Sequence, residues 1–78
     1  MDRKEFRRRL ARRVRDVRFE ELQKLLELYG WELDNIRGSH HVFRRGDEEL
    51  ISIPLRRPRV LEVYVRRAIR MTEDEDDE

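Results

Sequence analysis

Two adjacent histidines, His40 and His41, are the residues of this chain with the clearest chemical potential. They directly follow a Gly38-Ser39 pair, and the chain has no other histidine. The imidazole side chain, whose ordinary pKa is about 6.5, can take up and release a proton near neutral pH. Residues 37–70, which surround the pair, carry nine basic and four acidic side chains. A polyanion would therefore be attracted to the part of the chain that holds the histidines.

Metal binding and serine-hydrolase chemistry have little support in these residues. The chain has no cysteine and no third histidine, so a metal site would need carboxylate ligands. Neighbouring residues of a strand also point to opposite faces, which would separate His40 from His41. Sequence neighbours such as Ser39 and His40 rarely have the geometry of a nucleophile and its base. We expect neither a metal nor an organic cofactor.

Cleavage of RNA is a reaction that a histidine among arginines can catalyse. The 2′-hydroxyl of RNA attacks the neighbouring phosphate once a base removes its proton, so no enzyme nucleophile is needed. Arginine side chains can offset the charge that develops on the phosphate. The candidate phosphate contacts are Arg37, Arg44, Arg45, Arg56 and Arg57. The residues by themselves leave open two possibilities, a ribonuclease and an arginine-rich module that binds RNA without cutting it.

Length and composition indicate one small domain with charged ends. The chain has 78 residues, 47% of them charged, and its apolar residues are concentrated in the middle. We expect a basic helical extension over residues 1–17, a compact domain over 18–71 and a disordered acidic tail over 72–78. The sequence has no cysteine, no apolar run approaching the ~20 residues of a membrane span and no apolar signal-peptide stretch. A cytoplasmic protein is the expectation.

Two helices are predicted before the histidines. Residues 2–16 carry an apolar stripe on an otherwise arginine-rich helix, formed by Phe6, Leu10 and Val14. This segment is interpreted as a solvated extension, an RNA-binding arm or a surface that docks on the domain or on a partner. Residues 18–29 repeat apolar side chains every three or four positions, with Asp16 as the expected N-cap and Gly30 as the stop signal.

Three short strands and a closing helix follow. The predicted strands cover residues 31–35, 41–44 and 50–53, with turns marked by 38–39 and 46–47, so that His40 falls in the first turn, just before the second strand. The last helix is predicted from residue 59 or 60 to 71. The expected fold is α+β, with two helices on one face of a three-stranded antiparallel sheet and the other face open. Apolar periodicity favours a core position over base stacking for Tyr29, Trp31 and Phe43.

The segment GWELDNIRGSHHVF, from Gly30 to Phe43, resembles the core signature of the HicA toxin family. The later segments LISIP and YVRRAI are similar to that family's next strand and last helix, so the resemblance covers roughly residues 18–70. It implies a double-stranded-RNA-binding-like fold in a toxin that cleaves mRNA independently of the ribosome and pairs with a HicB-type antitoxin. The family's catalytic histidine maps onto His40, and the Gly-Ser of its turn maps onto Gly38 and Ser39. His41 is the second choice, because some members keep only the second histidine.

The sequence also departs from the family pattern. Leu55-Arg56-Arg57 follows the third-strand proline, where many relatives carry a histidine or a basic-polar cluster. Three hypotheses follow: an mRNA-cleaving toxin, an RNA-binding domain without catalysis, and a protein-interaction module that uses the stripe of the first helix or a sheet edge.

Overall fold

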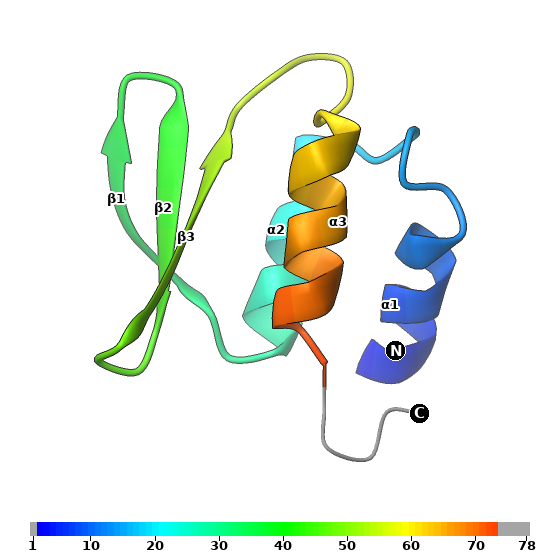
Figure 1. The fold of residues 1–78 in the computed structure, drawn as a ribbon, viewed down its shortest axis with the longest axis horizontal. Helices are drawn as coiled ribbons and strands as arrows, with labels where there is room; N and C mark the ends of the chain where they lie inside the picture. Colours follow the sequence, from blue (N-terminus) through cyan, green and yellow to red (C-terminus); the bar gives the residue numbers. More distant parts are fainter. Residues whose placement is uncertain (1, 74–78) are drawn as a thin grey trace.

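The computed structural model describes residues 2–73 and contains three helices and three strands in these residues (Figure 1). The elements are α1 (Arg3–Ala11), α2 (Phe19–Leu28), β1 (Glu32–Arg37), β2 (His40–Arg45), β3 (Glu49–Pro54) and α3 (Glu62–Met71). This order confirms the predicted α-β-β-β-α fold with an additional helix in front. Among residues 2–73, none of the helices has the length and hydropathy of a membrane span.

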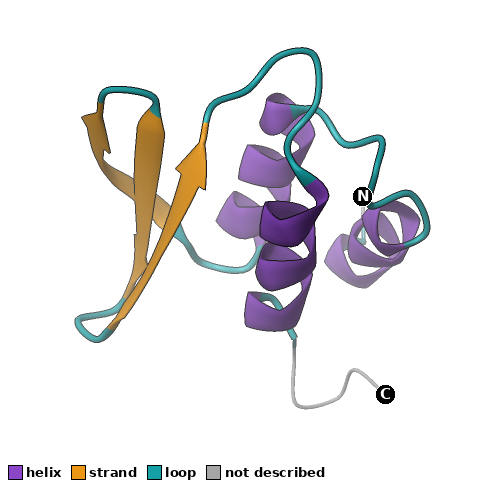
Figure 2. Cartoon of the chain, turned by 45° about the horizontal axis from the view of Figure 1, so that its top comes forward, coloured by secondary structure: helices purple, strands orange, loops and turns teal. Residues whose placement is uncertain are grey.

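The three strands form one antiparallel sheet with the order β1-β2-β3. Figure 2 shows α2 and α3 side by side on one face of this sheet, while no described element covers the other face. The register places His41 opposite Ile53 and Phe43 opposite Ile51, and these side chains share the face turned toward the helices. His40 lies opposite Pro54 and belongs to the uncovered face. The expectation of an open sheet face is therefore confirmed.

The core lies between the sheet and the α2–α3 pair. It contains the alternate strand residues on the inner face and the periodic apolar residues of α2, as the spacing predicted. Tyr29, Trp31 and Phe43 are all buried, which confirms their predicted core position. The buried residues of the strands and of the two central helices are Phe43, Ile51, Ile53, Phe19, Leu22, Leu25, Leu26, Val65 and Ala68.

Helix α1 packs on the side of α2 and α3 that faces away from the sheet (Figure 1). Phe6 and Leu10 are buried in the same core cluster as the sheet residues. Arg7 donates from Nε and one terminal nitrogen to the Ile69 carbonyl oxygen, at 3.1 and 2.7 Å, and so satisfies an acceptor at the end of α3. The segment expected to be an extension is thus an integral third layer of the fold.

Several predicted boundaries were wrong. The N-cap of α2 is Arg18, because the Asp16 carboxylate pairs with Arg59 instead. Helix α1 ends at Ala11 rather than residue 16, since residues 12–16 form turns. Helix α3 begins later than predicted, because the Val60 N–H bonds to the Val17 carbonyl oxygen and holds the chain in a loop.

The acidic segment begins after Thr72 rather than at it. Thr72 is fully buried, and its hydroxyl donates to the Ala68 carbonyl oxygen at 2.8 Å. It therefore closes α3 and belongs to the folded part of the chain. Of the rest of the predicted tail, Glu73 is exposed, and residues 74–78 lie outside the described residues.

Candidate functional site

The turn between β1 and β2 places the two histidines at one end of the sheet. Gly38 has a φ of 61°, a left-handed conformation that a side chain disfavours, so glycine suits this position. The Ser39 carbonyl oxygen accepts a hydrogen bond of 2.6 Å from the N–H of Leu55, the residue after β3. This bond ties the turn to the start of the loop between β3 and α3. Gly38 and Ser39 therefore shape the backbone beside the histidines.

His40 is the first residue of β2 rather than a residue of the turn, which corrects the predicted boundary. Its side chain is exposed on the uncovered sheet face, with Arg37 directly opposite on β1. The nearest polar partner is the Ser52 hydroxyl of β3, whose oxygen lies 3.4 Å from His40 Nδ1. The imidazole is thus open to a solute and has a hydroxyl on one side that can orient it.

His41 points to the opposite face and is half-buried. Its ring meets the Phe19 ring edge-on, with centroids 4.7 Å apart and an interplanar angle of 64°. His41 Nδ1 lies 3.4 Å from the Ser39 carbonyl oxygen, which can only accept, so a proton on Nδ1 suits this long contact. The alternation expected for neighbouring strand residues separates the two imidazoles. No group of three or more His, Asp or Glu side chains among residues 2–73 is placed to hold a metal ion.

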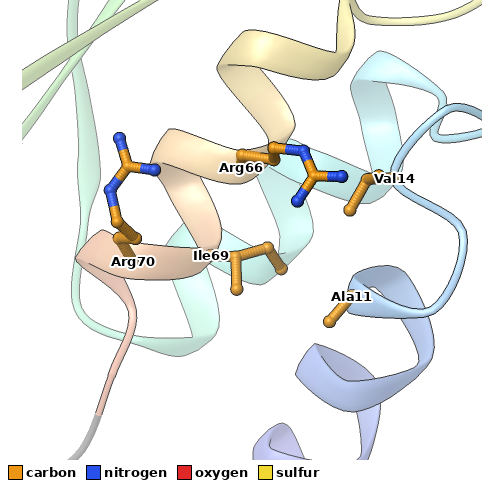
Figure 3. A pocket seen from close by; sticks show the side chains of 5 residues that line it. All are labelled: Ala11, Val14, Arg66, Ile69 and Arg70. Carbon is orange, nitrogen blue, oxygen red and sulfur yellow. The ribbon is translucent and has the colours of Figure 1, made fainter.

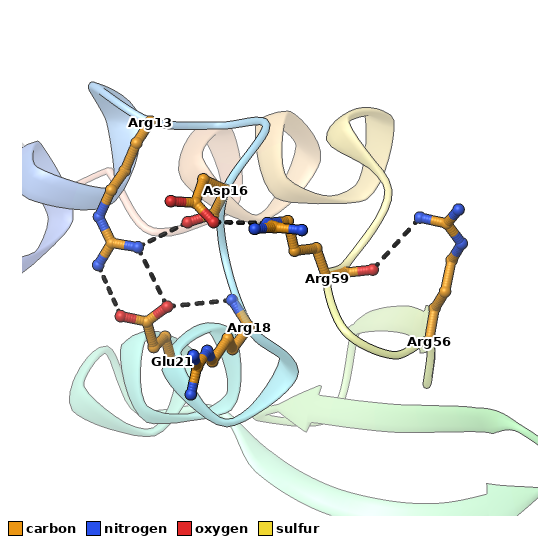
Figure 4. A network of polar contacts seen from close by, with 6 residues as sticks. All are labelled: Arg13, Asp16, Arg18, Glu21, Arg56 and Arg59. Carbon is orange, nitrogen blue, oxygen red and sulfur yellow. Dashed lines mark hydrogen bonds and ion pairs between the residues drawn. The ribbon is translucent and has the colours of Figure 1, made fainter.

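Three of the candidate arginines lie at the histidine end of the sheet. The Arg37 side chain is exposed, and its guanidinium makes no hydrogen bond or ion pair with another described residue. Arg56 is exposed and reaches the Arg59 carbonyl oxygen at 3.4 Å (Figure 4). Arg57 forms a bidentate ion pair with Glu20 at the N-terminus of α2, and one of its two hydrogen bonds measures 2.7 Å. This pairing lowers the pKa of the Glu20 carboxyl to about 2.

The other two candidates lie at the opposite end of β2. Arg44 pairs with Asp34 at 3.2 Å on the uncovered face. Arg45 points inward, pairs with Glu49 at 2.8 Å and lies over the Trp31 ring at 4.9 Å from its centroid. Arg44 and Arg45 therefore lie away from the histidines, and the Arg45 guanidinium stabilises the fold through its contacts with Glu49 and Trp31.

The loop that carries Arg56 and Arg57 is fastened to the segment before α2. Arg59 Nε donates to the Asp16 carboxylate at 2.6 Å, and this bond lowers the pKa of Asp16 (Figure 4). In the same network, Arg13 pairs with Glu21, whose carboxylate also accepts the Arg18 backbone N–H at 3.0 Å. The Arg59–Asp16 bond therefore holds this loop against the segment before α2.

Sequence reasoning missed three residues of this site: Ser52, Phe19 and Glu20. Ser52 could have been found from the alternation of β3, where it is the polar residue between Ile51 and Ile53. The contact of Phe19 with His41 and that of Glu20 with Arg57 depend on how α2 packs on the sheet. No local pattern in the sequence reports that packing.

Comparison with known proteins identifies the family of this chain. The model of the family described as the HicA toxin of bacterial toxin–antitoxin systems matches residues 19–72, more than two thirds of the chain. The protein belongs to the HicA toxin family. No curated protein and no solved structure matches the chain. The HicA segment includes the Gly-Ser turn, both histidines and the loop with Arg56 and Arg57, whereas α1 lies outside it. This HicA chain is thus the toxin type of a toxin–antitoxin pair, built on the family segment plus one helix.

Proposed function

We propose that this HicA-family protein is a metal-independent endoribonuclease that cleaves mRNA, with His40 as its acid–base residue. The observation that carries the proposal is the exposed His40 ring on the uncovered sheet face, directly opposite Arg37 and beside the glycine turn. A phosphate bound there would meet an imidazole and a guanidinium from adjacent strands. The open face gives a single-stranded RNA room to approach.

The reaction needs only groups of the protein and the substrate. His40 takes the proton from a 2′-hydroxyl, the 2′-oxygen forms a bond to the adjacent phosphorus, and the bond from phosphorus to the 5′-oxygen breaks. His40, now protonated, returns this proton to the leaving 5′-oxygen, and the products are a 2′,3′-cyclic phosphate and a 5′-hydroxyl. Arg37 and Arg56 stabilise the negative charge that develops on the phosphate, while Ser52 orients the His40 ring. Arg57 is a further phosphate contact, provided that the phosphate competes with Glu20 for its guanidinium.

His41 is the second candidate for the acid–base role. Its contact with the Ser39 carbonyl leaves Nε2 available as a base, and the Phe19 ring limits its rotation. Its half-buried position makes it less accessible than His40 to a phosphate on the open face. The two imidazoles lie on opposite faces, so single substitutions can separate their roles.

Purified protein, His40→Ala and His41→Ala are incubated with an mRNA in the presence and absence of a chelator. We expect cleavage that persists in chelator, is lost in His40→Ala and leaves a 2′,3′-cyclic phosphate. An RNA with methylated 2′-hydroxyls should resist cleavage, which controls for the proposed nucleophile. Loss of cleavage in His41→Ala but not in His40→Ala would transfer the role to His41. RNA binding without any product would instead assign a non-catalytic RNA-binding domain.

Membership of the family implies an antitoxin partner, and we propose that it is of the HicB type and covers the open sheet face in the cytoplasm. Binding there would block access to His40 without any change in the fold. Co-expression with the product of the neighbouring gene, followed by the cleavage assay on the purified complex, tests this arrangement. Full activity of a stable complex would contradict it.

A further inference from the structure

A second surface lies on the far side of the molecule from His40, between α1 and α3. Its lining residues are Ala11, Val14, Arg66, Ile69 and Arg70, which surround a hollow of about 200 Å³ (Figure 3). We call this feature the α1–α3 groove. Val14 and Ile69 are half-buried and pack against the core, so they form a fixed apolar floor. Figure 3 shows Arg66 extending toward Val14, while Arg70 lies on the side of Ile69 away from Ala11.

The groove depends on the helix that lies outside the family segment. Ala11 and Val14 come from the region before residue 19, whereas Arg66, Ile69 and Arg70 come from the matched segment. Without α1 there would be no second wall beside α3. The surface is therefore a property of this chain's own extension and independent of the site around His40.

The charge around the groove is strongly positive. Helix α1 carries five basic residues and one acidic residue, and α3 carries three and one. Arg66 uses Nε to pair with Glu62 at 2.7 Å, and its terminal nitrogens bond no other described residue. The Arg70 guanidinium makes no hydrogen bond or ion pair with another described residue, and the Arg66 and Arg70 side chains are both exposed. A partner that fits must bring negative charge to both flanks.

The size and the floor of the hollow restrict the partner further. Small-molecule sites usually measure about 300–1,000 Å³, so a hollow of about 200 Å³ suits one or two apolar side chains better than a cofactor. Ala11, Val14 and Ile69 offer no hydrogen bond to a nucleotide base or sugar. We propose that the α1–α3 groove binds an acidic amphipathic helix of a partner protein, with apolar side chains on the floor and carboxylates against Arg66 and Arg70.

Two other occupants fit the groove less well. RNA would satisfy the arginines but would leave the apolar floor without a complementary group. Residues 73–78 of the chain itself are all acidic, so they could pair with the arginines but have no apolar side chain for the hollow. An amphipathic acidic helix alone matches both the floor and its flanks.

The test uses the full chain and a fluorescent synthetic helix that has leucines at alternating three- and four-residue spacing and glutamates on its flanks. We expect saturable binding by anisotropy, with amide shifts at Ala11, Val14 and Ile69 in NMR spectra. The double variant Arg66→Gln/Arg70→Gln should bind about tenfold more weakly. Ala11→Glu, an exposed substitution that adds repulsive charge to the wall, should weaken binding by at least about tenfold. Arg37→Gln removes the same charge at the other end of the molecule and should bind as the parent does.

Four outcomes would overturn the proposal. Equal binding of a peptide whose leucines are replaced by serine would show simple charge attraction. Unchanged affinity in the groove variants, with native circular dichroism, would place the peptide elsewhere. Weakened binding of RNA rather than of the peptide in these variants would assign the surface to RNA. Binding of the peptide only after deletion of residues 73–78 would show that the chain's own acidic segment is the occupant.

Discussion

The two ends of β2 use their positively charged neighbours in different ways. At the end with Arg45, the guanidinium pairs with Glu49 and covers the Trp31 ring, so its charge is part of the folded framework. At the end with His40, Arg37 lies across the strand pair with no ion pair to a described residue. Both arginines looked equivalent in the sequence. Arginines whose bonds are already satisfied stabilise the fold, whereas those left open on an uncovered face are available to a polyanion.

The largest effect should come from the imidazole at the open end. His40→Ala should lower the rate of RNA cleavage by about a hundredfold to ten-thousandfold, the usual contribution of a positioned acid–base group. Its exposed side chain makes few contacts, so the urea midpoint should stay close to that of the parent. Single-turnover cleavage and urea denaturation measure the two quantities. A large drop in stability would show that His40 supports the fold and would remove the contrast between the ends.

Substitution of Arg45, at the other end of β2, should lower stability and leave RNA binding unchanged. Arg45→Ala should lower the free energy of unfolding by about 1 kcal/mol, through loss of the contact with the Trp31 ring and of a partly exposed ion pair. The salt dependence of RNA binding should stay unchanged. The matched control is Arg44→Ala, whose pair with Asp34 is exposed and should contribute less. A decrease in RNA affinity for Arg45→Ala at unchanged stability would contradict this assignment.

Arg37→Gln should affect binding and leave stability within about 0.5 kcal/mol of the parent. Loss of one phosphate contact should reduce the slope of log affinity against log salt by about 0.7 for single-stranded RNA. Fluorescence titration with an RNA carrying methylated 2′-hydroxyls measures this slope without cleavage. An unchanged slope would mean that Arg37 does not touch the phosphate backbone.

The smallest effect concerns Glu20, which engages Arg57 near the open end. Pairing lowers the pKa of the Glu20 carboxyl from 4.5 to about 2, so its contribution to stability is complete above pH 4.5. That contribution is lost as the pH falls from 4.5 through 2, because the carboxylate becomes protonated. Glu20→Gln should therefore flatten the acid side of the stability profile slightly, as measured by thermal unfolding between pH 2 and pH 5. An identical acid profile would show that water screens this exposed pair completely.

The sequence predicted where the site residues lie better than which of the charged ones form ion pairs. Apolar alternation located the three strands, but it began the second one at residue 41, so the opposite facing of His40 and His41 follows from the observed start of β2 at His40. The ion pair of Arg45 with Glu49 could not be predicted, since it depends on the hairpin register that brings Glu49 across from Arg45. The contact of Phe19 with His41 similarly depends on long-range packing.

The helical boundaries show the same limit. The periodicity before Gly30 correctly predicts a helix, but the prediction that Asp16 caps it is wrong. Its carboxylate instead binds Arg59, a residue 43 positions away. The sequence also leaves the docking of α1 open, because a narrow stripe of apolar residues among arginines looks the same on a free helix and on a packed one.

The bonds from Arg7 to the last turn of α3 have a practical consequence for work on this protein. They join a residue outside the family match to one inside it, and the same helix buries the Phe6 and Leu10 side chains. A chain shortened to residues 19–72 would expose apolar surface on the outer side of the helical layer and would be prone to aggregation. The segment that defines the family is therefore shorter than the part of the chain that must be expressed to obtain a complete fold.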